Sequence, residues 1–147
     1  MDKMSELMRK PRAMKQLLLA SLVILLIGCN PVEQTENKES SEMLGEEVFD
    51  NNCVVCHGSQ GRGLVSNWKV KGADGNYPAP PLNGTAHTWH HSPAQLLYTI
   101  NKGGVEMGGQ MPAFEKRLTE EEKKALIDYM YSLWPKEIQE KYDDRFK

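Results

Sequence analysis

Two cysteines and a histidine lie close together in the stretch FDNNCVVCHGSQG, residues 49 to 61. Cys53 and Cys56 are separated by two residues, and His57 follows at once. Thiolate and imidazole groups are good ligands for transition metals, and a closely spaced thiol pair can also carry out redox chemistry. The motif is therefore compatible with a redox dithiol, with half of a zinc site, or with an attachment point for haem.

The number and setting of the cysteines favour haem. A structural zinc site needs four nitrogen or sulfur ligands, usually from two Cys pairs, and the one remaining cysteine is Cys29. A thioredoxin-like dithiol requires a βαβ setting, and no strand-forming run flanks this motif. Haem attachment explains all three residues, because both thiols add to the haem vinyl groups and the adjacent imidazole becomes an axial ligand of the iron. We therefore expect one covalent haem c held by Cys53, Cys56 and His57.

A second axial ligand must come from farther along the chain. Met107 and Met111 both lie in the stretch GGVEMGGQMPAF, a glycine-rich loop whose backbone can approach a flat macrocycle closely. Met111 is followed by Pro112, which fixes the backbone just after the ligand. We predict Met111 as the second iron ligand and keep Met107 as the alternative.

Three of the four histidines lie in the stretch HTWHH, residues 87 to 91. They could bind copper or replace Met111 on the iron, because neutral imidazole suits both metals. The simpler interpretation is that they are polar residues at the start of a helix and hydrogen-bond haem propionates or backbone. We expect His87 or Trp89 to donate a hydrogen bond to a propionate.

The first 28 residues have the pattern of a targeting signal. Five basic residues precede an apolar run from Leu17 to Ile27, which is shorter than the roughly 20 residues of a membrane-spanning helix. The stretch LIGC, which ends at Cys29, resembles the lipobox of bacterial lipoproteins. We expect cleavage before Cys29, a lipid on its thiol, and a domain anchored on the extracytoplasmic side of a bacterial membrane, in the periplasm or at the cell surface. A short uncleaved anchor is the alternative.

Residues 29 to 43 contain the lipidated cysteine and a polar, acidic stretch without an apolar period, which predicts a flexible tether. The whole chain has a net charge of −2, and removal of residues 1 to 28 takes away five of the 18 basic and two of the 20 acidic residues, which leaves −5. An anionic protein suits a partner with a basic docking patch, and the charge gives no indication of nucleic-acid binding.

Three helices are expected to position the haem-binding residues. Apolar residues spaced for one face predict a first helix over residues 44 to 52. Two later helices start at capping boxes, in which a Ser or Thr and a Glu or Gln three residues on cap each other's backbone. These boxes are Ser92 with Gln95 and Thr119 with Glu122. The two helices end at Gly103 and before Pro135.

Residues 44 to 134 resemble the monohaem class I cytochromes c. The stretch CVVCHGSQGRG is similar to the family's attachment motif, PPLNG to its Pro-x-Leu-x-Gly segment, QMPAF to its distal methionine loop and LTEEEKKALIDYMYSLW to its C-terminal helix. The resemblance implies a small all-α fold, with three to five helices around one covalently attached haem c. It also implies a hydrogen bond from Nδ1 of His57 to the carbonyl of Pro80, and a close contact of Gly45 with Tyr129.

Two further segments lie outside this core pattern. Residues 64 to 79 form a longer loop than a minimal family member has, and Trp68 is expected over the haem edge or a neighbouring face. Residues 135 to 147 form a C-terminal extension after the end of the family's domain. Their apolar residues recur every four positions and predict a short amphipathic helix, with a frayed tail as the alternative. These residues are Ile138, Tyr142 and Phe146.

The expected coordination predicts an electron-transfer protein rather than an enzyme. An iron bound by both His57 and Met111 has no open position for a substrate. The resemblance implies electron transfer from a quinol-oxidising complex or dehydrogenase towards a terminal oxidase. Two alternatives stay open: a haem redox subunit, enzyme or sensor that acts on a small molecule through a labile distal ligand, and a copper-binding module that uses His87, His90 and His91.

Overall fold

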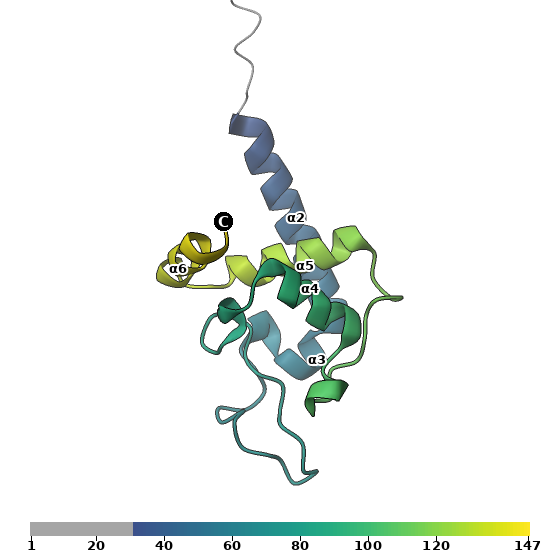
Figure 1. Ribbon diagram of the computed structural model, residues 1–147. Coiled ribbons are helices and arrows are strands. Elements are labelled where there is room, and N and C mark those ends of the chain that lie inside the picture. Colours follow the sequence, from purple (N-terminus) through teal and green to yellow (C-terminus); the bar gives the residue numbers. More distant parts are fainter. Residues whose placement is uncertain (1–30) are drawn as a thin grey trace, which may run out of the picture. The chain divides into compact units, whose positions relative to one another are not determined.

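The computed structural model describes residues 31–147, and the side chains from residue 35 onward. In this part of the chain the secondary structure is helical, without strands (Figure 1). The five α-helices are α2 (Pro31–Asn52), α3 (Val54–His57), α4 (Pro93–Lys102), α5 (Glu120–Ser132) and α6 (Lys136–Phe146). Short 3-10 helices in the connections are η2 (Ser59–Gly61), η3 (Thr88–His90) and η4 (Val105–Met107). The predicted all-α fold with three to five helices is confirmed.

The predicted targeting signal, residues 1 to 28, and the predicted lipidation site, Cys29, lie outside the described residues. Both stay predictions. Among the helices that the structure describes, none has the length and apolar character needed to cross a membrane.

Helix α2 begins at Pro31, well before the predicted helix start at residue 44. The prediction of an irregular tether up to residue 43 is therefore wrong about the conformation of residues 31 to 43. This stretch lacks an apolar stripe, but it is rich in good helix formers, and Lys38 lies 3.6 Å from Glu42 one turn later. The high content of good helix formers in residues 31 to 43, rather than the spacing of apolar residues, was the signal for this helix.

Helices α2 and α5 cross at a glycine. A Cβ atom added to Gly45 would lie 2.1 Å from the carbonyl oxygen of Ala125 and 2.7 Å from the Cβ atom of Tyr129. Only a residue without a side chain fits at this crossing, so the predicted contact between Gly45 and Tyr129 is confirmed. Nearby, Oγ of Ser41 donates to a carboxylate oxygen of Asp128 at 2.8 Å, which joins the same two helices.

The core lies between α2, α4 and α5. Phe49 is fully buried, and its ring centroid lies 5.5 Å from that of Tyr129. The buried cluster consists of Val48, Phe49, Cys53, Ile100, Phe114, Leu118, Leu126, Tyr129 and Met130. Since Cys53 belongs to this cluster, the core directly supports the first residue of the cysteine motif.

Both predicted capping boxes are present. The side chain of Ser92 accepts a hydrogen bond from the backbone of Gln95, whose side chain caps Ser92 in return, and Thr119 and Glu122 do the same at the start of α5. Each box satisfies backbone N–H groups that would otherwise lack partners at a helix start.

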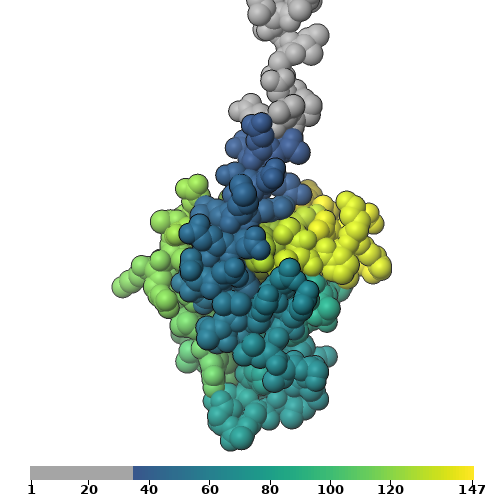
Figure 2. Space-filling model, turned by 180° about the vertical axis from the view of Figure 1, so that it is seen from behind, coloured from purple at the N-terminus to yellow at the C-terminus, as the bar shows by residue number. Residues whose placement is uncertain are grey.

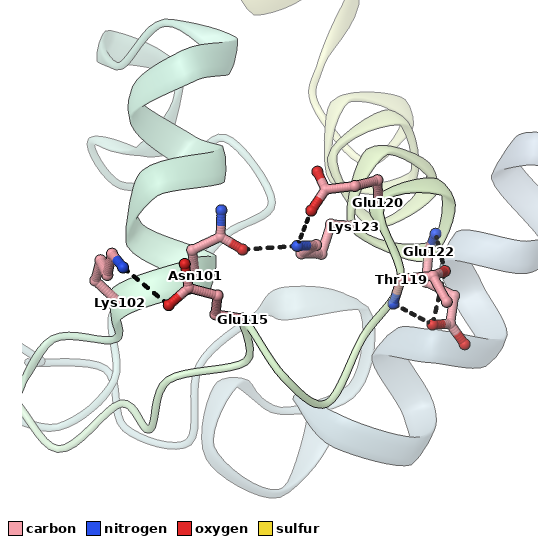
Figure 3. A network of polar contacts seen from close by, with 7 residues as sticks. All are labelled: Asn101, Lys102, Glu115, Thr119, Glu120, Glu122 and Lys123. Atoms are coloured by element: carbon pink, nitrogen blue, oxygen red, sulfur yellow. Dashed lines mark hydrogen bonds and ion pairs between the residues drawn. The ribbon is translucent and has the colours of Figure 1, made fainter.

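A buried lysine connects α4 with α5 (Figure 3). Lys123 is 1% exposed, and its Nζ donates to Oδ1 of Asn101 at 2.8 Å and to the carboxylate of Glu120. At the end of α4, Lys102 pairs with Glu115 at 2.8 Å. These contacts hold the end of α4, the segment that follows it and the start of α5 together.

Residues 136 to 146 form helix α6 rather than a frayed tail. Tyr142 is 2% exposed, and its ring packs against Trp134 with a centroid distance of 4.8 Å. Figure 2 shows α6, in yellow, at the surface of the molecule. The C-terminal extension therefore buries an aromatic face against the end of α5.

Candidate functional site

The described residues form a cavity with a volume of about 760 Å³. Its walls come from α3, α4 and α5, from the end of α2, and from two loops that include residues 64–79 and 104–112. The lining is mainly apolar, with Leu96, Ile100 and Phe114 among its residues. Protein interiors are normally close-packed, so a hollow of this size and character is suited to a large apolar ligand.

The two cysteines reach the cavity from one helical turn. Cys53 is the N-cap of α3, and its carbonyl accepts hydrogen bonds from the backbone N–H groups of Cys56 at 3.1 Å and His57 at 2.9 Å. All three side chains line the cavity, and both cysteines are free thiols. Burial, together with the neighbouring Cys56, raises the pKa of the Cys53 thiol to about 11. Two thiols and an imidazole thus lie along one wall.

The imidazole of His57 is buried and fixed by a backbone carbonyl. Its Nδ1 lies 2.9 Å from the carbonyl oxygen of Pro80. Because a carbonyl only accepts, Nδ1 carries the proton and Nε2 keeps its lone pair. Burial lowers the pKa of His57, while the bond to Pro80 acts in the opposite direction. The hydrogen bond that the resemblance implied is therefore present, and the imidazole has the tautomer that a metal ligand requires.

Glycines bring Pro80 back to His57. The backbone N–H of Gly63 donates to the carbonyl of His57 at 2.6 Å, and that of Leu82 donates to the carbonyl of Gly61 at 2.7 Å. Gly61 has a φ of +64°, and a Cβ atom there would lie 3.1 Å from the Cβ atom of Leu82. The turn after the cysteine motif therefore needs residues without side chains, which accounts for its glycine-rich sequence.

The same segment is also held from the far end of α5. The indole Nε1 of Trp134 donates to the carbonyl of Leu82 at 2.7 Å. In addition, Oγ1 of the buried Thr88 donates to the carbonyl of Pro81 at 3.3 Å. Pro80 is thus placed by contacts at the two residues that follow it.

Both candidate methionines line the cavity, but only one is supported by packing. Met107 is 67% exposed, whereas Met111 is half-buried and packs against the core. The loop closes on itself, because the N–H of Gly104 donates to the carbonyl of Met111 at 2.9 Å. A Cβ atom on Gly103 would lie 2.4 Å from that carbonyl oxygen, so glycine is required where α4 meets this loop. The geometry favours Met111 over Met107.

The histidine-rich stretch is divided between two environments. His87 and His91 line the cavity, and His87 stacks on Trp68 with a centroid distance of 5.3 Å. The ring centroids of Trp89 and His90 lie 4.0 Å apart, and both residues line a smaller hollow instead. Residues 88–90 form a 3-10 turn, in which successive side chains point in different directions. The structure therefore brings His87 to the cavity and Trp89 to the smaller hollow, and the expected hydrogen bond from either residue to a haem propionate stays a prediction.

A copper site receives no support from the arrangement of these residues. In the part of the chain that the structure describes, no three His, Cys, Asp or Glu side chains come together in a way that could hold a metal ion. Trp68 lines the cavity on the wall formed by the loop of residues 64–79, and its expected position over the haem edge stays a prediction.

Comparison with known proteins identifies the family. Residues 41–130 match the family model described as cytochrome c oxidase, cbb3-type, subunit III. The chain belongs to this family of cytochromes c. Membership implies a covalently attached haem c and a role in electron transfer. No solved structure matches the chain.

Several curated proteins are similar to parts of this cytochrome c. It is 35% identical over 89 residues to the Cbb3-type cytochrome c oxidase subunit CcoP of Azospirillum sp. (strain B510), an alignment that covers 60% of this chain and 27% of that protein. It is 26% identical over 105 residues to the cytochrome c subunit of the quinone alcohol dehydrogenase of Gluconobacter oxydans (strain 621H), with 67% and 20% covered. It is 27% identical over 99 residues to cytochrome c6 of Chlorolobion braunii, with 63% and 91% covered. The chain thus spans about a quarter of the oxidase subunit.

Two features, one of the core and one of the site, were not predicted. The buried Lys123 lies three and seven residues before Leu126 and Met130, on the apolar stripe of α5, so its position in the stripe was a usable signal. A hydrogen bond between Asp74 and Gln110 joins the two loops at the cavity. Contacts between exposed residues far apart in the sequence leave no such local signal.

Proposed function

We propose that this chain is a membrane-anchored one-electron carrier on the extracytoplasmic side of a bacterial membrane. One haem c would be attached to Cys53 and Cys56, with His57 and Met111 as axial ligands of its iron. The observation that supports this most is that these four residues line one apolar cavity, although they come from two separate segments.

The residues present fit such a group. Both cysteines are free thiols at the cavity, His57 has its Nδ1 directed to the carbonyl of Pro80, and Met111 is half-buried beside the core. The cavity volume of about 760 Å³ lies within the range of roughly 300–1,000 Å³ that is common for ligand sites.

Each residue has a distinct part in the proposed activity. Haem c supplies an iron that alternates between Fe(II) and Fe(III). The thiols hold the group in place, and Pro80 orients the imidazole of His57 and increases its basicity. The soft thioether of Met111 would favour the reduced state, and the apolar lining would disfavour the extra positive charge of the oxidised state. With His57 and Met111 both bound to the iron, the protein itself would occupy the positions where a substrate could bind.

The redox partners are proposed from the relatives. One similar protein is named as a subunit of a cytochrome c oxidase, and another as the cytochrome c subunit of a quinone alcohol dehydrogenase. These names support a carrier that receives electrons from a quinol-oxidising complex or dehydrogenase and passes them towards a terminal oxidase. The apolar run before Cys29 supports a lipid anchor at the membrane where such complexes lie.

Two measurements on the full chain test this proposal. Mass spectrometry should find one haem added covalently to the chain, and no covalent haem in the variant with Cys53→Ser and Cys56→Ser combined. The reduced protein should be reoxidised by membranes that contain a cytochrome oxidase, and cyanide, which blocks the oxidase, should stop the reaction. A chain that carries haem but does not exchange electrons with any oxidase or dehydrogenase would contradict the proposed function.

A further inference from the structure

A single side-chain hydrogen bond joins the two loops that line the cavity. Nε2 of Gln110 donates to Oδ2 of Asp74 at 3.0 Å, across 36 positions of sequence. Both residues line the cavity, and Gln110 directly precedes Met111. Figure 1 shows the loop of residues 64–79 and η4 at the same end of the molecule. The bond therefore connects the long loop to the segment that carries the predicted distal ligand.

Other hydrogen bonds hold the carboxylate of Asp74 in position to accept this bond. Its Oδ1 accepts from the backbone N–H of Asn76 at 3.1 Å, and the N–H of Gly72 donates to the carbonyl of Asn76 at 2.9 Å. Oδ1 thus fixes a tight turn, while Oδ2 accepts from Gln110 and also, at 3.4 Å, from the side-chain amide of Asn76. The hydrogen bonds from Asn76 and Gln110 hold the pKa of Asp74 below its usual value. A charged acceptor forms a stronger hydrogen bond than a neutral one.

The loop around Gln110 has few other contacts that would hold its tip. Val105 is 66% exposed and Met107 is 67% exposed, so neither anchors the loop by burial. The N–H of Gly109 donates to the carbonyl of Gly104 at 2.9 Å, which closes the loop on itself rather than onto the rest of the protein. A segment with little buried apolar surface opens easily unless another contact holds it.

We propose that the hydrogen bond between Asp74 and Gln110 is a latch that keeps Met111 on the haem iron and small ligands away from it. This inference rests on the proposed function, because it requires Met111 to be the distal ligand. Asp74 and Gln110 act as positioning residues: they touch neither the iron nor the thioether, and they act through the backbone next to Met111. The loop of residues 64–79, which had no assigned role, becomes the fixed side of the latch.

The latch can be broken and restored by charge. Gln110→Glu places two carboxylates against each other and opens it. Combining Gln110→Glu with Asp74→Asn reverses donor and acceptor and restores the bond, while the Asn amide oxygen still accepts from the N–H of Asn76. A matched control is Gln60→Glu, at an exposed loop position whose side chain accepts a hydrogen bond from Arg62 and does not line the cavity.

The readouts are the rate of cyanide binding to the ferric full chain and the far-red absorption band of a sulfur-to-iron bond. Gln110→Glu should speed cyanide binding roughly tenfold, as expected for the loss of one charge-assisted hydrogen bond, and should weaken the band. Hydrogen exchange of the Gly104 and Gly109 amides should become faster in the same variant. The combined variant and Gln60→Glu should behave like the wild type within about twofold.

The possible negative results distinguish a failure of the latch from a failure of the proposed function. If the far-red band depends on Met111 but Gln110→Glu leaves the cyanide rate and the band unchanged, the latch is refuted and the proposed function stands. If the combined variant stays as fast as Gln110→Glu, the added charge rather than the lost bond is responsible, which also refutes the latch. If the wild type has no band that depends on Met111, the proposed ligand set fails and the latch fails with it.

Discussion

Nδ1 of His57 lies 2.9 Å from the carbonyl oxygen of Pro80, which follows it by 23 residues. The bond connects the cysteine motif to a segment that the glycine-rich turn and Trp134 hold in place. It sets the tautomer and orientation of the imidazole before any metal is present. The properties of the site therefore depend on residues that never touch the iron, such as Gly61.

Gly61→Ala should raise the reduction potential by several tens of millivolts. The new Cβ atom would press on Leu82, displace the segment around Pro80 and weaken its bond to His57. A less basic imidazole stabilises the oxidised iron less. Redox titration measures the shift. Ser59→Ala is the control, because Ser59 is exposed and lies in the same turn, η2. An equal shift in both variants would contradict this explanation.

Gly45→Ala should lower the free energy of unfolding by about 3 kcal/mol. Its Cβ would lie 2.1 Å from the carbonyl oxygen of Ala125, so α2 and α5 would have to move apart. Denaturant unfolding measures the change, and Glu47→Ala, at an exposed position of the same helix, is the control. Unchanged stability in Gly45→Ala would show that the crossing is looser than described.

Tyr142→Phe should leave the stability at neutral pH unchanged or raise it by about 1 kcal/mol. The hydroxyl is buried, and among the described residues it has no hydrogen-bond partner, so its removal relieves a desolvation cost. Thermal unfolding near pH 7 measures this effect. A clear loss of stability in this variant would mean that the hydroxyl has a partner.

The same tyrosine should make the protein sensitive to alkali. Burial, and to a lesser extent Asp143, raises the pKa of Tyr142 to about 12. In the unfolded chain the phenol ionises near pH 10, so the folded state holds its proton longer and loses stability as pH rises from about 10 to 12. Tyr142→Phe should remove part of this loss, measured as the difference between the two denaturation profiles over that range.

Cys29→Ser should release the protein from membranes. A lipid on Cys29 would contribute about 0.8 kcal/mol per buried methylene, which is enough with several chains to hold the domain at the bilayer. Fractionation of cells measures the distribution, with a high-salt wash of wild-type membranes as the control for electrostatic attachment. Continued membrane association of Cys29→Ser would favour an uncleaved apolar anchor instead.

Local patterns in the sequence predicted the parts of this structure that depend on neighbouring residues. The cysteine motif and the capping boxes at Ser92 and Thr119 involve residues two or three positions apart, and the structure contains both boxes. The contact of Gly45 with Tyr129 spans a long distance, and it was predicted only through the family resemblance.

Other features could not be read from local spacing. The helix from Pro31 to residue 43 has no apolar stripe. Its acidic, polar composition therefore predicted a tether, even though many of its residues are good helix formers. His87 and Trp89 were alike candidates to donate to a propionate, and the 3-10 turn of residues 88–90 leaves His87, but not Trp89, at the cavity. The bond between Asp74 and Gln110 depends on how two loops meet, which neither loop's sequence indicates.

The optical spectrum of the oxidised protein tests the central claim most directly, in the wild type and in two matched variants, Met111→Ala and Met107→Ala. Both methionines lie in one loop and line the cavity, so Met107→Ala shows whether the loss of any methionine from this loop changes the spectrum. The proposed carrier predicts a far-red sulfur-to-iron band that disappears in Met111→Ala and persists in Met107→Ala, with slow cyanide binding by the wild type. A wild-type spectrum without the band, together with immediate cyanide binding, would contradict the proposed carrier and favour a haem protein that acts on a small molecule.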